Sequence, residues 1–139
     1  RDLQADLHRV FEAWSEPALV SRWLAPSDEY EVEIHEWGFR LGGAYRLTMR
    51  HSGGNRHTVG GHFSKIERSG VLTFSWIWED RPEMPTTVEV VWRAGEDGSL
   101  MTLRHAGFPS EQERDDHGKA WSAILKRLER ELGSGSSVS

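Results

Sequence analysis

The spacing of apolar residues changes twice along this chain, and this change limits the folds open to it. Between residues 28 and 108 apolar and polar residues alternate, as where Tyr30, Val32 and Ile34 are separated by charged or imidazole side chains. A two-residue period is typical of strands with one buried face. Turn-forming clusters divide the region into six strands with mostly short links, which predicts an antiparallel meander. The strands are expected near residues 30–35, 45–50, 57–66, 71–79, 86–94 and 99–106.

Two short helices are predicted before the first of these strands. After Asp6, a residue type that caps helix N-termini, apolar residues recur at helical spacing as far as Trp14. A second helix is expected to begin at Pro17, because proline fits the first helical turn, and to end at Pro26. The apolar stripe of each helix carries a tryptophan, Trp14 or Trp23, which we expect to face the sheet.

The last predicted element is a long amphipathic helix. Ser110 followed by Glu113 is the pattern of a capping box at its start, and Gly133 is expected to end it. Residues 134–139 are small and polar, so we expect a flexible tail. No linker divides residues 1–133, which are interpreted as a single domain. The apolar face of the helix consists of Trp121, Ile124, Leu125, Leu128 and Leu132.

Composition and charge exclude several classes of function. The chain has no cysteine, so disulfides, thiol catalysis and thiolate metal sites are excluded. Its net charge of −5 has the wrong sign for electrostatic nucleic-acid binding, and no nucleic-acid partner is expected. No apolar run is long enough to cross a membrane, and the N-terminus lacks the apolar segment of a signal peptide. We therefore expect no membrane insertion and a cytoplasmic location.

A basic stretch in the middle of the chain is interpreted as structural. Residues 38–66 include five basic residues and no acidic one. Neighbouring strands commonly pair opposite charges on their outward faces. Arg46 and Arg50 are therefore expected to pair with acidic residues of the preceding strand. Glu31 and Glu33 are the expected partners.

No metal site and no cofactor are predicted from the motifs. His57 and His62 share a strand, but a spacing of five residues places them on opposite faces. The paired glycines at 42–43, 53–54 and 60–61 match no phosphate-binding loop. We interpret these glycines as turns and bulges.

The candidate site is an aromatic surface between the sheet and the long helix. Alternation places Phe74, Trp76 and Trp78 on one face of their strand, and Trp92 on the same face of the next. Gly118 is expected to face these rings, so that its missing side chain leaves a space. A few polar groups are expected to converge on these apolar walls, as in many ligand sites. They are Glu36, His105 and His117.

With these elements placed, the chain resembles the START-like helix-grip superfamily (SRPBCC). Within it, the chain looks like the branch of homologues of the activator of the heat-shock-protein-90 ATPase. The resemblance covers nearly the whole chain, and its opening Phe-x-Ala-Trp-x-x-Pro and later His-x-Gly-Phe are its most specific parts. It is carried by VFEAWSEP from Val10, RWLAP from Arg22, GGAY from Gly42, GHFSKI from Gly61, LTFSWIWE from Leu72, TVEVVW from Thr87, MTLRH from Met101, GFP from Gly107, and Trp121.

The resemblance implies an α+β helix-grip fold. A curved antiparallel sheet of six or seven strands would wrap around the long C-terminal helix, with two short helices after the first strand. The chain departs from the usual pattern of the family in two ways. Family members usually carry a full strand before the first helix, where this chain has only residues 1–4. They also show glycine directly before the helix tryptophan, where this chain has Ala120 before Trp121.

The function that we expect from these residues is binding of a small, largely apolar molecule between the helix and the sheet. Two alternatives stay open: a chaperone-associated protein-interaction module, and a cyclase- or dehydratase-like enzyme with Glu36, His105 or His117 as general acid or base. No catalytic residue is assigned, and a homodimer is also open. The predicted ligand-binding residues are Tyr45, Phe74, Trp76, Trp78, Trp92, His105, Gly118 and Trp121, with Glu36 and His117 as polar groups of the cavity.

Overall fold

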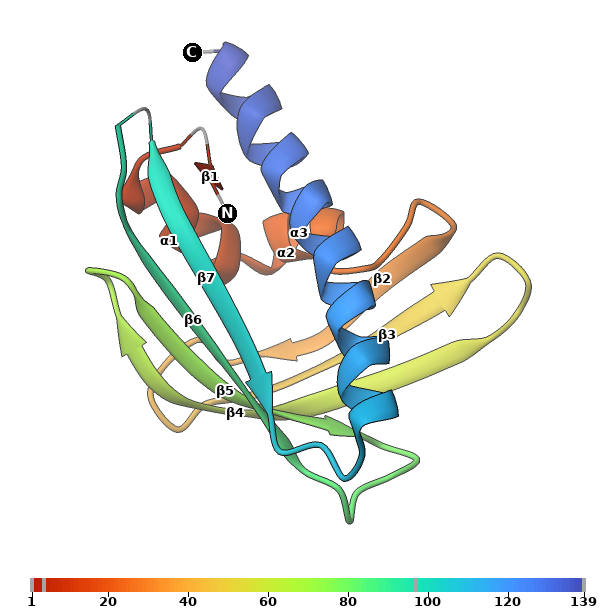
Figure 1. Ribbon diagram of the computed structural model, residues 1–139. Helices are drawn as coiled ribbons and strands as arrows, with labels where there is room; N and C mark the ends of the chain where they lie inside the picture. Colours follow the sequence, from red (N-terminus) through yellow and green to blue (C-terminus); the bar gives the residue numbers. More distant parts are fainter. Residues whose placement is uncertain (1, 4, 97, 139) are drawn as a thin grey trace.

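A single curved sheet wraps around one long helix in the computed structural model of the protein (Figure 1). The structure describes residues 2–3, 5–96 and 98–138. The sheet is antiparallel, with strand order β1-β7-β6-β5-β4-β3-β2. The strands are β1 (Asp2–Leu3), β2 (Tyr30–Trp37), β3 (Ala44–His51), β4 (Arg56–Glu67), β5 (Val71–Trp78), β6 (Thr86–Ala94) and β7 (Ser99–Ala106). The α+β helix-grip architecture is thus confirmed, with all six predicted strands in sequential order.

The two predicted short helices are present, and they pack against each other and against the sheet at β6 and β2. They are α1 (Leu7–Ser15) and α2 (Pro17–Trp23). Asp6 caps α1 by accepting a hydrogen bond from the backbone N–H of Arg9 at 2.9 Å. Trp14 and Trp23 are fully buried, and their rings meet edge to face at 4.6 Å. Burial of two large aromatic rings at this contact anchors the helix pair to the core.

The first strand is much shorter than the others. β1 pairs only Asp2 with Leu100 and Leu3 with Ser99. Leu3 is buried, and the Ser99 hydroxyl donates to the carbonyl of Ala5 at 2.7 Å. This short pairing holds Asp2 and Leu3 against β7.

A bulge in β2 overturns the prediction for Glu36. Ile34 pairs with Leu47, but Glu36 pairs with Arg46, so His35 is an extra residue between them. A bulge reverses the inward and outward alternation that follows it. Glu36 is therefore exposed, and Trp37 turns inward, where its indole N–H donates to the carbonyl of Trp14 at 3.0 Å.

The basic stretch does pair across strands, but with one partner different from the prediction. Arg50 binds the Glu33 carboxylate at 2.5 and 3.0 Å, as expected. Arg46 pairs instead with Glu79, which lowers the pKa of that carboxyl through their hydrogen bond. Glu79 follows β5, two strands away from β3, and its side chain reaches Arg46 across β4, where glycines occupy positions 60 and 61.

The long helix α3 (Glu111–Val138) crosses the concave side of the sheet. The Ser110 hydroxyl accepts from the N–H of Glu113 at 3.2 Å, which is half of the predicted capping box. The Glu113 carboxylate pairs with Arg81 instead of reaching back. The predicted end at Gly133 is wrong, because the helix continues through this residue. A glycine inside a helix costs only about 1 kcal/mol relative to alanine.

Within the described part of the chain, none of the helices combines the length and the apolarity needed to cross a membrane. The flexible tail at 134–139 stays a prediction.

Candidate functional site

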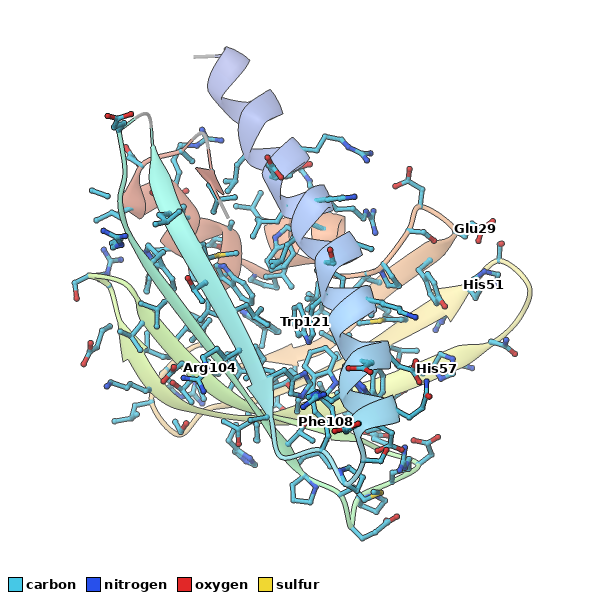
Figure 2. The ribbon with its side chains drawn as sticks, in the orientation of Figure 1. Glu29, His51, His57, Arg104, Phe108 and Trp121 are labelled. Atoms are coloured by element: carbon cyan, nitrogen blue, oxygen red, sulfur yellow. The ribbon has the colours of Figure 1, made fainter. Side chains whose placement is uncertain are left out.

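Two histidines and several aromatic rings gather where the first turns of α3 meet β5, β6 and β7. Phe108 and Trp121 mark this region in Figure 2. His105 comes from β7 and His117 from α3, and their rings lie 5.3 Å apart. Phe108 contacts both, with ring centroids 4.4 Å from His105 and 4.6 Å from His117. We call these three residues the His–Phe cluster.

Hydrogen bonds hold His105 in its neutral form. The indole N–H of Trp121 donates to Nδ1 at 2.9 Å, so this nitrogen carries no proton. Nε2 lies 2.6 Å from the Thr86 hydroxyl, which itself donates to the carbonyl of Trp76 at 2.7 Å. Nε2 is therefore the protonated nitrogen and donates to Thr86. Burial, and then the neighbouring His117, lower the pKa of His105 from 6.5 to about 3.

His117 is held in the same way with the opposite tautomer. Its Nδ1 lies 2.8 Å from the carbonyl of Glu113, which can only accept, so Nδ1 carries the proton. Its Nε2 accepts from the indole N–H of Trp78 at 2.9 Å. All four ring nitrogens of the two histidines thus have protein partners. These hydrogen bonds tie α3 directly to β5 and β7, and His105 extends the network to Thr86 of β6.

The structure brings together five of the predicted site residues. The Trp76 ring meets the Trp78 ring edge to face at 5.5 Å and the Trp121 ring at a tilt at 5.2 Å, measured between ring centroids. His105 and His117 complete this group through the hydrogen bonds described above. The predicted aromatic surface therefore exists at one end of the helix–sheet contact.

Three other predicted residues lie elsewhere. Tyr45 and Phe74 are in the core, where the Tyr45 hydroxyl donates to the carbonyl of Ser75 at 2.6 Å and burial raises the pKa of Tyr45. Trp92 contacts Phe11 of α1 at the other end of β6. These three residues also lie on the inward face of the sheet, but away from the His–Phe cluster.

Gly118 does not face the tryptophans of the sheet, so its predicted placement is wrong. It is exposed, and a Cβ atom there would meet no heavy atom within 4 Å. Two helical turns separate Gly118 from Leu125, and both residues lie on the flank of α3 next to β7. Trp121 occupies the inward face instead.

An open groove lies on this flank, between α3 and β7. Its volume is about 320 Å³, within the range of small-molecule sites. The walls are largely apolar, and Gly118 contributes open space to one of them. The lining residues are Leu103, His105, Phe108, Arg114, Gly118, Trp121, Ser122 and Leu125. We call this space the α3–β7 groove.

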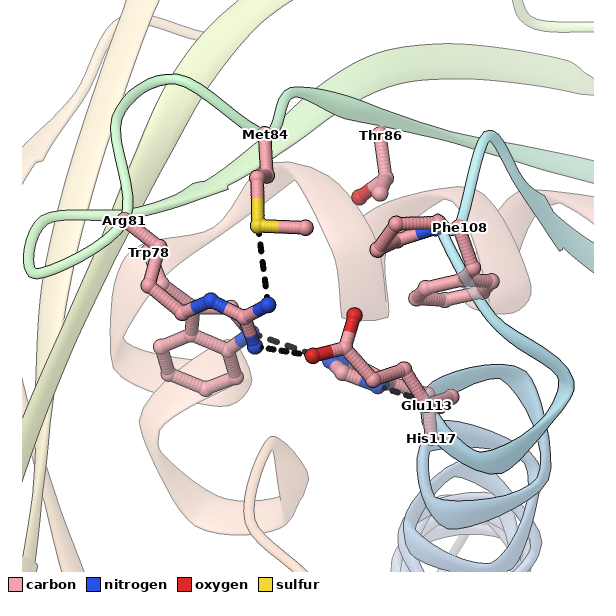
Figure 3. A pocket seen from close by; sticks show the side chains of 8 residues that line it. Trp78, Arg81, Met84, Thr86, Phe108, Glu113 and His117 are labelled. Carbon is pink, nitrogen blue, oxygen red and sulfur yellow. Dashed lines mark hydrogen bonds and ion pairs between the residues drawn. The ribbon is translucent and has the colours of Figure 1, made fainter.

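A much smaller pocket lies on the other side of Phe108, between α3 and the loop that joins β5 to β6 (Figure 3). Its volume is about 10 Å³, at most the space of one water molecule. It is lined by Trp78, Arg81, Met84, Thr86, Phe108, Pro109, Glu113 and His117.

Sequence reasoning missed several residues of both spaces. Thr86 is the first residue of a predicted strand and Phe108 follows the end of another, and nothing in their local pattern indicates that they contact a histidine. Arg81 and Glu113 are separated by 32 positions in the sequence, and only the folded chain pairs them. Within the ranges that the structure describes, no three His, Asp or Glu side chains gather as a metal site would require.

Similar structures support the fold over nearly the entire chain. A protein from Chromobacterium violaceum is 20% identical with a TM-score of 0.85, covering 95% of this chain and 93% of that one. An AHSA1 protein from Silicibacter pomeroyi, also 20% identical with a TM-score of 0.85, covers 97% and 95%. A protein from Arthrobacter aurescens is 22% identical with a TM-score of 0.83, covering 96% and 83%. No curated protein matches the chain significantly.

One protein family accounts for both the sequence and the fold. The family described as activator of Hsp90 ATPase homolog 1-like protein matches residues 4–133, which is nearly the whole chain. This match agrees with the order of two short helices, six-strand meander and long C-terminal helix. The chain therefore belongs to the activator of Hsp90 ATPase homolog 1-like family, a branch of the START-like SRPBCC superfamily.

Proposed function

We propose that this domain binds a small, largely apolar molecule in the α3–β7 groove. The observation that carries the proposal is the groove itself, because about 320 Å³ of space is lined by Leu103, Trp121 and Leu125. Burying apolar ligand surface there would contribute roughly 25 cal/mol per Å² before the costs of association. Polar groups at the rim, including Arg114 and Ser122, would orient the ligand.

The two other functions have less support. A general acid or base needs a nitrogen or carboxylate free to reach a ligand, but Glu36 points outward and the ring nitrogens of His105 and His117 are engaged. A protein-docking module would favour a contiguous apolar patch. Among the described residues the exposed large apolar side chains are Leu41, between β2 and β3, and Val91, on β6. Strands β4 and β5 lie between β3 and β6 in the sheet, so these two side chains do not form a contiguous patch.

Gly118 provides a direct test of the groove. Gly118→Leu adds a side chain where a Cβ meets only open space, so it is expected to fill the groove without overpacking the core. Helix propensity rises by about 0.5–1 kcal/mol. We expect the variant to be as stable as the parent or more so, and to bind the neutral probe N-phenyl-1-naphthylamine at least about tenfold more weakly.

Gly118→Ala is the matched control, because it also raises helix propensity but adds only one carbon atom. We expect it to bind the probe like the parent. Fluorescence titration measures binding, and thermal unfolding measures stability. Equal probe binding by the parent and both variants, or a Gly118→Leu variant clearly less stable than the parent, would contradict the proposal.

A further inference from the structure

The small pocket beneath the β5–β6 loop is closed by a cation of the chain itself. Arg81, in that loop, extends its guanidinium to the Glu113 carboxylate in the first turn of α3 (Figure 3). Its Nη2 also donates to the Met84 sulfur at 2.8 Å. With Arg81 in place only about 10 Å³ is left. The volume that the guanidinium occupies is therefore space that would open if this side chain moved away.

The walls around the guanidinium are those of a site for an organic cation. Trp78, Phe108 and His117 supply aromatic rings, and Met84 supplies a polarisable thioether. His117 is neutral in its hydrogen-bonding arrangement and so does not repel a cation. One carboxylate, Glu113, completes the site.

The charges near the pocket favour a cation as well. Asp80 and Glu83 flank Arg81 in the same loop. Together with the hydrogen-bonded Glu113, these carboxylates raise the pKa of Arg81. The nearby Arg114 has its own partner in Asp115. Without Arg81, the pocket would keep aromatic walls and the Glu113 carboxylate, with Asp80 and Glu83 exposed in the adjoining loop.

We propose that this pocket binds a small quaternary ammonium compound, and that Arg81 is an internal competitor which the ligand displaces. A quaternary ammonium group fits better than a metal ion, since aromatic faces attract it and hard metal ions need several oxygen ligands. Displacement needs only a side-chain movement. The backbone of Arg81 stays fixed by turn hydrogen bonds from its N–H to Trp78 O at 3.0 Å and from the N–H of Met84 to Arg81 O at 3.1 Å.

The test uses choline and its uncharged isostere 3,3-dimethylbutan-1-ol as probes. Each is titrated into the parent and into Arg81→Ala, and the indole N–H signal of Trp78 is followed by NMR, assigned with Trp78→Phe. Arg81→Ala is expected to bind choline at least about tenfold more tightly than the parent does. It is also expected to prefer choline to the neutral isostere by a similar factor. Arg81→Gln, which removes the charge and keeps a polar side chain, provides a second variant with the same expected direction.

Two further variants serve as controls. Arg81→Ala with Glu113→Gln is expected to lose most of the gained affinity, because the carboxylate is gone. Arg104→Ala removes an exposed arginine of β7 that lines neither this pocket nor the α3–β7 groove, and it is expected to bind choline like the parent. The proposal is overturned if the Arg81 variants fold but do not bind choline, or if they bind choline and the isostere equally.

This inference is independent of the ligand proposed for the α3–β7 groove. Phe108 lines both spaces, but Arg81 and Gly118 each line only one of them. The Arg81→Ala variant is therefore expected to bind N-phenyl-1-naphthylamine like the parent, and Gly118→Leu to bind choline like the parent. If one proposal fails, the other can therefore still be tested.

Discussion

Replacing Trp14 with alanine is expected to lower the free energy of unfolding by about 3–5 kcal/mol, the usual range for a buried large aromatic side chain. Trp14 is fully buried and contacts Trp23 at 4.6 Å and Phe74 at 6.1 Å. Its removal would leave a cavity where α1, α2 and β5 meet. The measurement is equilibrium unfolding in urea, monitored by circular dichroism.

Leu41→Ala is the control for this prediction. Leu41 is 74% exposed, so its truncation is expected to change stability by less than about 0.5 kcal/mol. An unchanged unfolding midpoint for Trp14→Ala would mean that the ring is not part of the core, and the placement of α1 would be wrong.

Acid is expected to destabilise the protein through His105. The pKa of this residue is about 3 in the folded protein, compared with about 6.5 for an ordinary histidine. The unfolded chain therefore binds one more proton at this residue between these values, and stability falls as the pH falls from about 6.5 toward 3. One excluded proton gives a limiting slope of about 1.4 kcal/mol per pH unit, and partial exposure of the ring narrows the pH range over which this slope applies.

The variant His105→Phe separates the contribution of His105 to the pH dependence of stability from that of the other titratable groups. The variant loses the bonds to Thr86 and Trp121, so it is expected to be less stable near pH 7. Between about pH 6.5 and 5 its stability is expected to depend less on pH than that of the parent. His62→Gln alters an exposed histidine of β4 and is expected to keep the slope of the parent. Equal slopes for the parent and His105→Phe would rule out His105 as the acid-sensitive group.

Hydrophobic periodicity was sufficient to predict most of the fold. The alternation from Tyr30 onward marks strands because their inward residues pack against the core and their outward residues are more exposed. The same reasoning failed where one residue broke the period, since the bulge at His35 turned Glu36 outward. A bulge has no reliable signal in one sequence, because any residue type can occupy it.

The candidate site was predictable only in part. Trp76 and Trp78 follow from strand alternation, and Trp121 follows from the helix stripe. The prediction for Gly118 failed because its spacings of three to Trp121 and seven to Leu125 both fit the apolar face of the helix, whereas the residue lies on the flank of α3 next to β7. The pairing of Arg81 with Glu113 depends on the path of a loop, which local patterns do not determine.

Intermolecular NMR contacts between the bound probe and the protein test the proposed function most directly. With N-phenyl-1-naphthylamine bound, the account predicts nuclear Overhauser effects from its ring protons to the methyl groups of Leu103 and Leu125 and to the indole of Trp121, all of which line the α3–β7 groove. These contacts are expected to disappear in Gly118→Leu and to persist in Gly118→Ala. The proposed function would be contradicted if the probe showed contacts only to other parts of the surface, such as Leu41 or Val91, and none to the groove residues.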